Sequence, residues 1–116
     1  IVDLGTNDII GSEAQSGGFE EFSKLIKEEY IKFVQALKEK YPNAAIVLCS
    51  GTFNYSKMDL QKYDAVFAEV AASFEESQKV YHCRFEKSDN AHPTSEENQE
   101  YGKILAQKLR TVLGWE

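Results

Sequence analysis

Proline, cysteine, methionine and tryptophan are scarce in this chain, which has 116 residues with 2 Pro, 2 Cys, 1 Met and 1 Trp. The low proline content, with hydrophobic residues at 42% and charged residues at 28%, excludes a disordered or fibrous chain and indicates a soluble globular domain. The length provides for one hydrophobic core and therefore for one domain.

Long apolar runs and an excess of basic charge are also absent. No apolar run is long enough to cross a membrane, so no membrane association is expected. Lys and Arg number 13 against 19 Asp and Glu, which gives a net charge of -6 at pH 7. This acidic balance argues against a nucleic acid as partner. A signal peptide, where the gene encodes one, would lie upstream of Ile1.

Spacings typical of metal or phosphate binding are missing. Cys49 and Cys83 each close an apolar segment, without a Cys-x-x-Cys pattern or a His-rich neighbourhood. This context favours two unpaired buried thiols over a disulfide or a metal pair. Gly17-Gly18 lacks the lysine and the preceding strand that a phosphate-binding loop requires. We therefore expect neither a metal nor an organic cofactor.

Strand-like segments alternate with amphipathic helices along the chain. Predicted strands cover residues 1–4, 44–49 and 80–83, predicted helices cover 19–41, 60–74 and 95–113, and a turn at 5–8 and loops at 11–18 and 50–57 lie between them. The run Ala44–Cys49 is continuously apolar, as in a strand buried on both faces. Thr94 and Glu97 form a capping box, and Gly114 ends the last helix. This order predicts an α/β fold with three αβα layers and a parallel sheet.

One loop at the carboxyl end of a predicted strand has the residues of a general base. His92 follows Asp89 by three residues, close enough for a turn to bring the carboxylate against the imidazole. Such a carboxylate fixes the tautomer and stabilises the imidazolium. The alternative is that both are surface residues of a turn. The other histidine, His82, has no partner in the sequence and is predicted to be structural.

A second such loop has a candidate oxyanion donor. Asn7 follows the first predicted strand, and its amide N–H can stabilise a developing negative charge on oxygen. The alternative is that Gly5, Asn7 and Asp8 only form the turn that ends the strand. Because functional residues of parallel sheets gather at the carboxyl ends of the strands, we expect Asn7 and His92 to lie at one edge.

Two motifs resemble blocks of a known family. Leu4-Gly5-Thr6-Asn7-Asp8 and Asp89-Asn90-Ala91-His92-Pro93 are similar to the third and fifth blocks of the SGNH (GDSL-type) hydrolases, whose fold is flavodoxin-like. All 116 residues together resemble the C-terminal part of carbohydrate esterase family 2, whose members deacetylate plant cell-wall polysaccharides such as xylan and glucomannan. The resemblance implies that this chain is part of a secreted bacterial enzyme.

The resemblance implies roles for individual residues. Asn7 would be the oxyanion donor, on a turn formed by Gly5, with Asp8 holding that turn. His92 would be the general base, oriented by Asp89 or, as in some members of the family, by a backbone carbonyl. Phe53 and Tyr55 occupy a loop whose aromatic residues stack on sugar rings in relatives, with core packing as the equal alternative. No metal or cofactor is implied.

The chain departs from the family in one large respect. The Gly-Asp-Ser block with the nucleophilic serine does not occur in the sequence. Its context is absent around five serines, namely Ser12, Ser16, Ser50, Ser88 and Ser95. Residues 1–116 would thus be the C-terminal portion of a single hydrolase domain. This portion alone is expected to be inactive.

Two other classes of protein are compatible with this sequence. The chain could be a non-catalytic carbohydrate-binding or structural module on the same fold, or a flavodoxin-like signalling domain. The expected partners are an acetylated polysaccharide and the N-terminal part of the same domain. Without that part, the edge of the strand Ile1–Leu4 would be unpaired, and the chain alone is expected either to self-associate through this edge or to be marginally stable.

Overall fold

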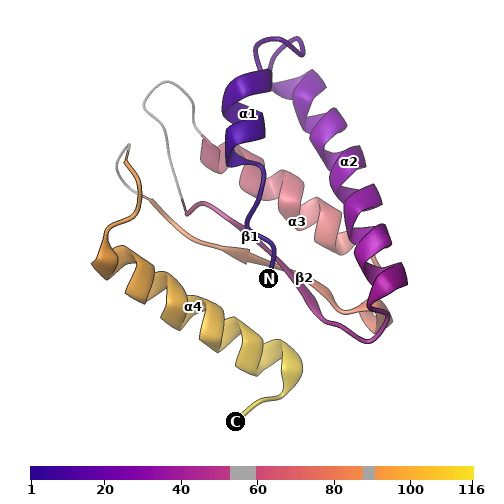
Figure 1. Ribbon diagram of the computed structural model, residues 1–116, viewed down its shortest axis with the longest axis vertical. Helices are drawn as coiled ribbons and strands as arrows, with labels where there is room; N and C mark the ends of the chain where they lie inside the picture. Colours follow the sequence, from indigo (N-terminus) through magenta and orange to yellow (C-terminus); the bar gives the residue numbers. More distant parts are fainter. Residues whose placement is uncertain (53–59, 88–90) are drawn as a thin grey trace.

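The computed structural model describes residues 1–52, 60–87 and 91–116. Its elements, in chain order, are α1 (Thr6–Ser12), α2 (Phe19–Lys40), β1 (Ile46–Ser50), the 3-10 helix η1 (Leu60–Tyr63), α3 (Asp64–Ala72), the 3-10 helix η2 (Glu76–Gln78), β2 (Val80–Arg84) and α4 (Ser95–Leu113). Figure 1 shows α4 on one side of the strands and the other three α-helices on the opposite side. The predicted three-layer α/β fold is confirmed.

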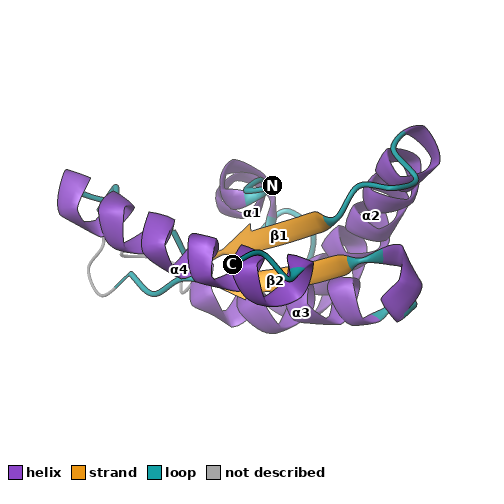
Figure 2. Ribbon diagram, turned by 90° about the horizontal axis from the view of Figure 1, so that it is seen from below, coloured by secondary structure: helices purple, strands orange, loops and turns teal. Residues whose placement is uncertain are grey.

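The two strands run parallel, with Ile46 opposite Val80 and Ser50 opposite Arg84 (Figure 2). Val2 extends this sheet at the free edge of β1 by a parallel bridge to Leu48. The bridge consists of two backbone hydrogen bonds, from the Val2 N–H to the Val47 carbonyl at 2.8 Å and from the Cys49 N–H to the Val2 carbonyl at 2.7 Å.

The strand predicted over residues 1–4 is therefore reduced to one bridged residue. Gly5 has a φ of 109°, which ends the extended conformation directly after Leu4. Ile1 and Leu4 are 65% and 60% exposed. Large apolar side chains thus remain at the surface along this edge of the sheet.

All five residues of β1 are buried, which confirms the prediction of a strand covered on both faces. One core lies between the sheet and α1, α2 and α3 and includes Ile9, Ile26, Val34, Leu48, Phe67, Val70 and Val80. The other lies between the sheet and α4 and includes Val47, Cys49, Cys83, Phe85 and Tyr101. Side chains alternate between these cores because successive residues of a strand point to opposite faces.

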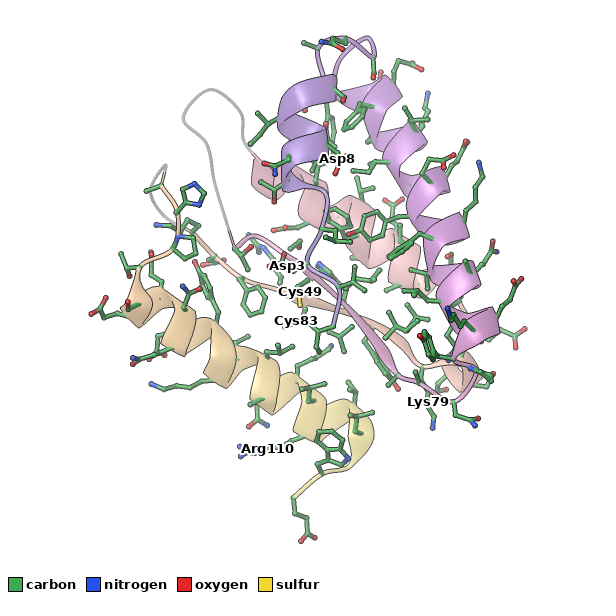
Figure 3. All side chains as sticks on the ribbon, in the orientation of Figure 1. Asp3, Asp8, Cys49, Lys79, Cys83 and Arg110 are labelled. Carbon is green, nitrogen blue, oxygen red and sulfur yellow. The ribbon has the colours of Figure 1, made fainter. Side chains whose placement is uncertain are left out.

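Both cysteines belong to the core beneath α4. Cys49 and Cys83 lie opposite each other in the sheet (Figure 3), and both are buried free thiols, as predicted. Burial raises the pKa of Cys49 to about 12. The thiol is therefore protonated at neutral pH and acts as a small apolar side chain.

The predicted turn at residues 5–8 is wrong, because a short helix occupies most of that segment and part of the predicted loop at 11–18. α1 begins at Thr6, and its Ile9 is only 3% exposed in the core with α2 and α3. A helix of seven residues has too few periodic positions to be told from a loop by its sequence. The burial of Ile9 is what favours the helix here.

Candidate active site

The first motif lies where the chain leaves the sheet and enters α1. Gly5 is buried, and its positive φ of 109° places the first turn of the helix directly after the edge of the sheet. Asn7 and Asp8 are exposed in this first turn, where a negative charge such as that of Asp8 stabilises the N-terminus (Figure 3). Gly5 thus forms the bend after which α1 begins, with Asn7 in the first turn of this helix.

Tyr30 of α2 stabilises the bend at Gly5. Its hydroxyl donates a hydrogen bond of 2.7 Å to the Leu4 carbonyl, and its ring meets that of Phe67 edge-on at 4.9 Å. Burial raises the pKa of Tyr30 to about 12. The hydroxyl therefore stays protonated and remains a donor to Leu4 at all ordinary pH values.

The other end of α1 is anchored to η1. Glu13, the residue after the helix, accepts hydrogen bonds from the Lys62 ammonium at 3.0 Å and from the fully buried Tyr63 hydroxyl. Burial alone would raise the pKa of Glu13, but the hydrogen bonds from Tyr63 and Lys62 together hold it below its ordinary value. The helix that carries Asn7 is thus attached at both ends.

The second motif lies between β2 and α4. His92 is exposed and precedes the N-cap residue Thr94 by two positions. The capping box is confirmed: the Glu97 N–H donates to Thr94 Oγ1 at 3.2 Å and the Thr94 N–H donates to Glu97 Oε2 at 2.7 Å. Three other predicted site residues lie outside the described residues, namely Asp89, Phe53 and Tyr55.

Both motifs follow the carboxyl ends of strands that run in the same direction. The Thr52 hydroxyl, beyond the end of β1, donates to Asp3 Oδ2 at 3.2 Å and links two of the segments that leave this edge. Figure 1 shows α1 and the first turn of α4 on the side toward which the strands point. The segments with Asn7 and His92 therefore begin at the same edge, where parallel α/β proteins bind ligands.

A serine–histidine pair also exists, which the sequence did not reveal. Ser50 Oγ and His82 Nε2 are 2.8 Å apart. Parallel pairing places Leu48 opposite His82, so Ser50 lies two residues further along on the same face. Ser50 is 5% exposed, which leaves little room for a substrate. His82 is thus a hydrogen-bonded structural histidine, in agreement with its predicted role.

The same face of the sheet carries an ion pair between a half-exposed arginine and a nearly buried aspartate. Arg84 Nε donates to Asp64 Oδ2 at 2.6 Å, and the side chain of Asp64, the first residue of α3, is 10% exposed. Its other oxygen, Oδ1, is buried and has no hydrogen-bond partner among the residues that the structure describes. Neither residue was singled out from the sequence, because their contact depends on how α3 packs against β2.

His82 is expected to make the stability of the chain depend on pH. Burial lowers its pKa below the ordinary value of 6.5, Lys108 and Arg84 lower it further, and Asp64 opposes them. The unfolded chain therefore binds the proton more readily, so the free energy of unfolding falls as the pH is lowered from about 7.5 to about 5.5. Urea unfolding at both pH values measures this change.

The variant His82→Gln is the control for this prediction. Its side chain can keep a hydrogen bond to Ser50 but does not titrate, and His92 is present in both proteins. The variant should lose less stability than the parent over the same pH interval. Equal losses in the two proteins would contradict the assignment.

Two negative findings concern the described residues. Within 1–52, 60–87 and 91–116, no group of three or more His, Cys, Asp or Glu side chains could hold a metal ion. No helix in this part of the chain is sufficiently long and apolar to cross a membrane.

The helices on both faces of a parallel sheet, with both motifs at its carboxyl edge, define the class: an α/β protein of the flavodoxin-like type to which the SGNH hydrolases belong. The chain matches the crystal structure of a carbohydrate esterase family 2 enzyme with its carbohydrate-binding domain, from Corynascus thermopiles (Myceliophthora fergusii). The match has a TM-score of 0.77 at 20% sequence identity and covers 97% of this chain and 36% of that protein.

This likeness confirms the predicted fold, that of part of a carbohydrate esterase family 2 enzyme. No protein-family model and no curated protein sequence matches the chain. The chain spans about a third of the length of the matched structure. The bacterial origin expected from the sequence stays a prediction, since the similar enzyme comes from Myceliophthora fergusii.

Proposed function

We propose that this chain is part of a secreted serine esterase that removes O-acetyl groups from plant cell-wall polysaccharides of the xylan or glucomannan type. The observation that carries the proposal is the fold match to a carbohydrate esterase over 97% of the chain, with the segments of Asn7 and His92 leaving the same sheet edge. This arrangement is the one in which a base and an oxyanion donor could act on one substrate.

In the proposed reaction, His92 removes the proton from a serine hydroxyl as the serine oxygen attacks the acetyl carbonyl carbon. Asn7 donates a hydrogen bond to the carbonyl oxygen, which becomes negative as the new C–O bond forms. The imidazolium of His92 then protonates the sugar oxygen, which leaves as a hydroxyl group. A water molecule, deprotonated by His92, attacks the acyl-serine, and acetate is released as the serine recovers its proton.

Asp89 or a backbone carbonyl would orient His92, and Phe53 and Tyr55 would stack on the sugar. The serine would come from a preceding part of the same domain. The edge at Val2 suits the addition of such strands, since both backbone hydrogen bonds of Val2 go to β1 and the residue before it, Ile1, is exposed. Self-association of the chain through this edge stays part of the proposal.

The test is acetate release by a longer protein that contains this chain, incubated with acetylated xylan and with acetylated glucomannan. We expect release by the longer protein and none by residues 1–116 alone, because the Gly-Asp-Ser block does not occur in this sequence and Ser50, the partner of His82, is buried. Titration with the same polysaccharides completes the test. Saturable binding by the longer protein without acetate release would support a non-catalytic carbohydrate-binding module instead.

A further inference from the structure

A lysine with no access to solvent lies between β2 and His92. The side chain of Lys87 is 0% exposed, and its Nζ lies 2.9 Å from Glu97 Oε1 in the first turn of α4. An ammonium group in the interior is unfavourable unless a carboxylate pairs with it. This ion pair therefore differs from the exposed pairs elsewhere on the helices, which contribute little.

The carboxylate of Glu97 holds two points of the chain. Oε1 contacts Lys87, where the chain has left the sheet, and Oε2 accepts the Thr94 N–H at 2.7 Å, where the chain enters α4. The backbone hydrogen bond from Thr94 and the Lys87 ammonium keep the pKa of Glu97 below its ordinary value. His92 lies between these two points in the sequence.

The segment before Lys87 is held by the same helix. The Tyr101 hydroxyl donates to the Glu86 carbonyl at 3.0 Å, and the Tyr101 ring packs on Phe85 with the ring centres 5.0 Å apart. The end of β2 is thus fixed on α4, so the ion pair joins two well-anchored parts of the molecule.

We propose that Lys87 and Glu97 form a clamp that positions His92 at the carboxyl edge of the sheet. This inference rests on the proposed function, in which His92 is the base. Neither Lys87 nor Glu97 contacts a substrate in this proposal. Their role is to fix the path of the chain on both sides of His92, because a base displaced by about 1 Å can cost a factor of roughly 100 in rate.

The clamp is tested first in the chain itself. Glu97→Gln keeps an oxygen that can accept the Thr94 N–H, since glutamine is accepted in capping boxes, but removes the charge that faces Lys87. Lys87→Met removes the other partner. The matched control is Glu100→Gln, which removes the carboxylate of the exposed Lys103–Glu100 pair on the same helix.

The measurement is the backbone order parameter of His92 from ¹⁵N relaxation. We expect about 0.85 in the parent and in Glu100→Gln, and below about 0.6 in both clamp variants. If Lys87→Met does not fold, Glu97→Gln alone decides the outcome. A His92 that stays as ordered as in the parent while the melting temperature falls would overturn the clamp and leave only a structural ion pair.

The second measurement uses the longer protein. Both clamp variants should lower kcat by roughly tenfold to a hundredfold with KM within about twofold of the parent, and Glu100→Gln should change neither. Loss of His92 order in the chain, with no esterase activity in the longer parent protein, would refute the proposed function and leave the clamp intact. If the longer protein is active and neither clamp variant changes kcat, the proposal that the clamp positions His92 is refuted.

Discussion

Replacing His92 with alanine in a longer, active protein that contains this chain is expected to lower kcat/KM by about a thousandfold. General base catalysis contributes a factor of about 10² to 10⁴, and a serine without its base is a poor nucleophile at neutral pH. The rate of acetate release from acetylated xylan measures the effect. His92 is exposed, so the variant should keep the melting temperature of the parent.

His82→Gln is the matched control, because it replaces the other histidine of the chain. Its partner Ser50 is 5% exposed and lies on the face of the sheet that α3 covers. This variant should release acetate at the parent's rate below its own melting temperature. If His92→Ala kept full activity, the proposed role of His92 as the general base would be refuted.

Gly51→Ala is expected to destabilise the chain by about 3 to 5 kcal/mol. Gly51 has a φ of 82°, which costs other residues about 1 to 3 kcal/mol. An added Cβ would also overlap the Phe85 carbonyl oxygen and lie 3.0 Å from the carbonyl carbon. Overpacking against backbone adds a similar amount, because neither strand can give way without breaking the Phe85–Ser50 backbone hydrogen bond. Urea unfolding at neutral pH measures the loss.

The control for this prediction is Gly102→Ala. Gly102 lies on the exposed side of α4, and a Cβ there meets nothing within 4 Å. This change should stabilise the chain by about 0.5 to 1 kcal/mol, since alanine favours helices. If Gly51→Ala were as stable as the parent, the close approach of Gly51 to Phe85 would be refuted.

The features predicted well from the sequence depend on neighbouring residues. The capping box of Thr94 and Glu97 joins residues three positions apart, and the apolar stripe that includes Tyr30 repeats every three or four residues. Both patterns can therefore be recognised from the sequence alone. The burial of β1 on both faces follows equally from its continuous apolar run.

The features that were missed depend on distant contacts. The Ser50–His82 hydrogen bond requires the register between β1 and β2, and the Lys87–Glu97 pair requires the approach of α4 to the end of β2. α1 was missed because its stability comes from Ile9 in the core rather than from a visible period. Sequence resemblance named Asn7 and His92, but the side chains that hold their segments became visible only in three dimensions.

The attachment of α1 at both ends has a consequence for the energetics of the proposed reaction. Tyr30 holds the Leu4 carbonyl before the helix, and Glu13 binds Lys62 and Tyr63 after it. The conformational entropy of this helix is therefore lost when the chain folds and not when a substrate binds. As an oxyanion donor on a preorganised helix, Asn7 would contribute to kcat with little reorganisation at the moment of reaction.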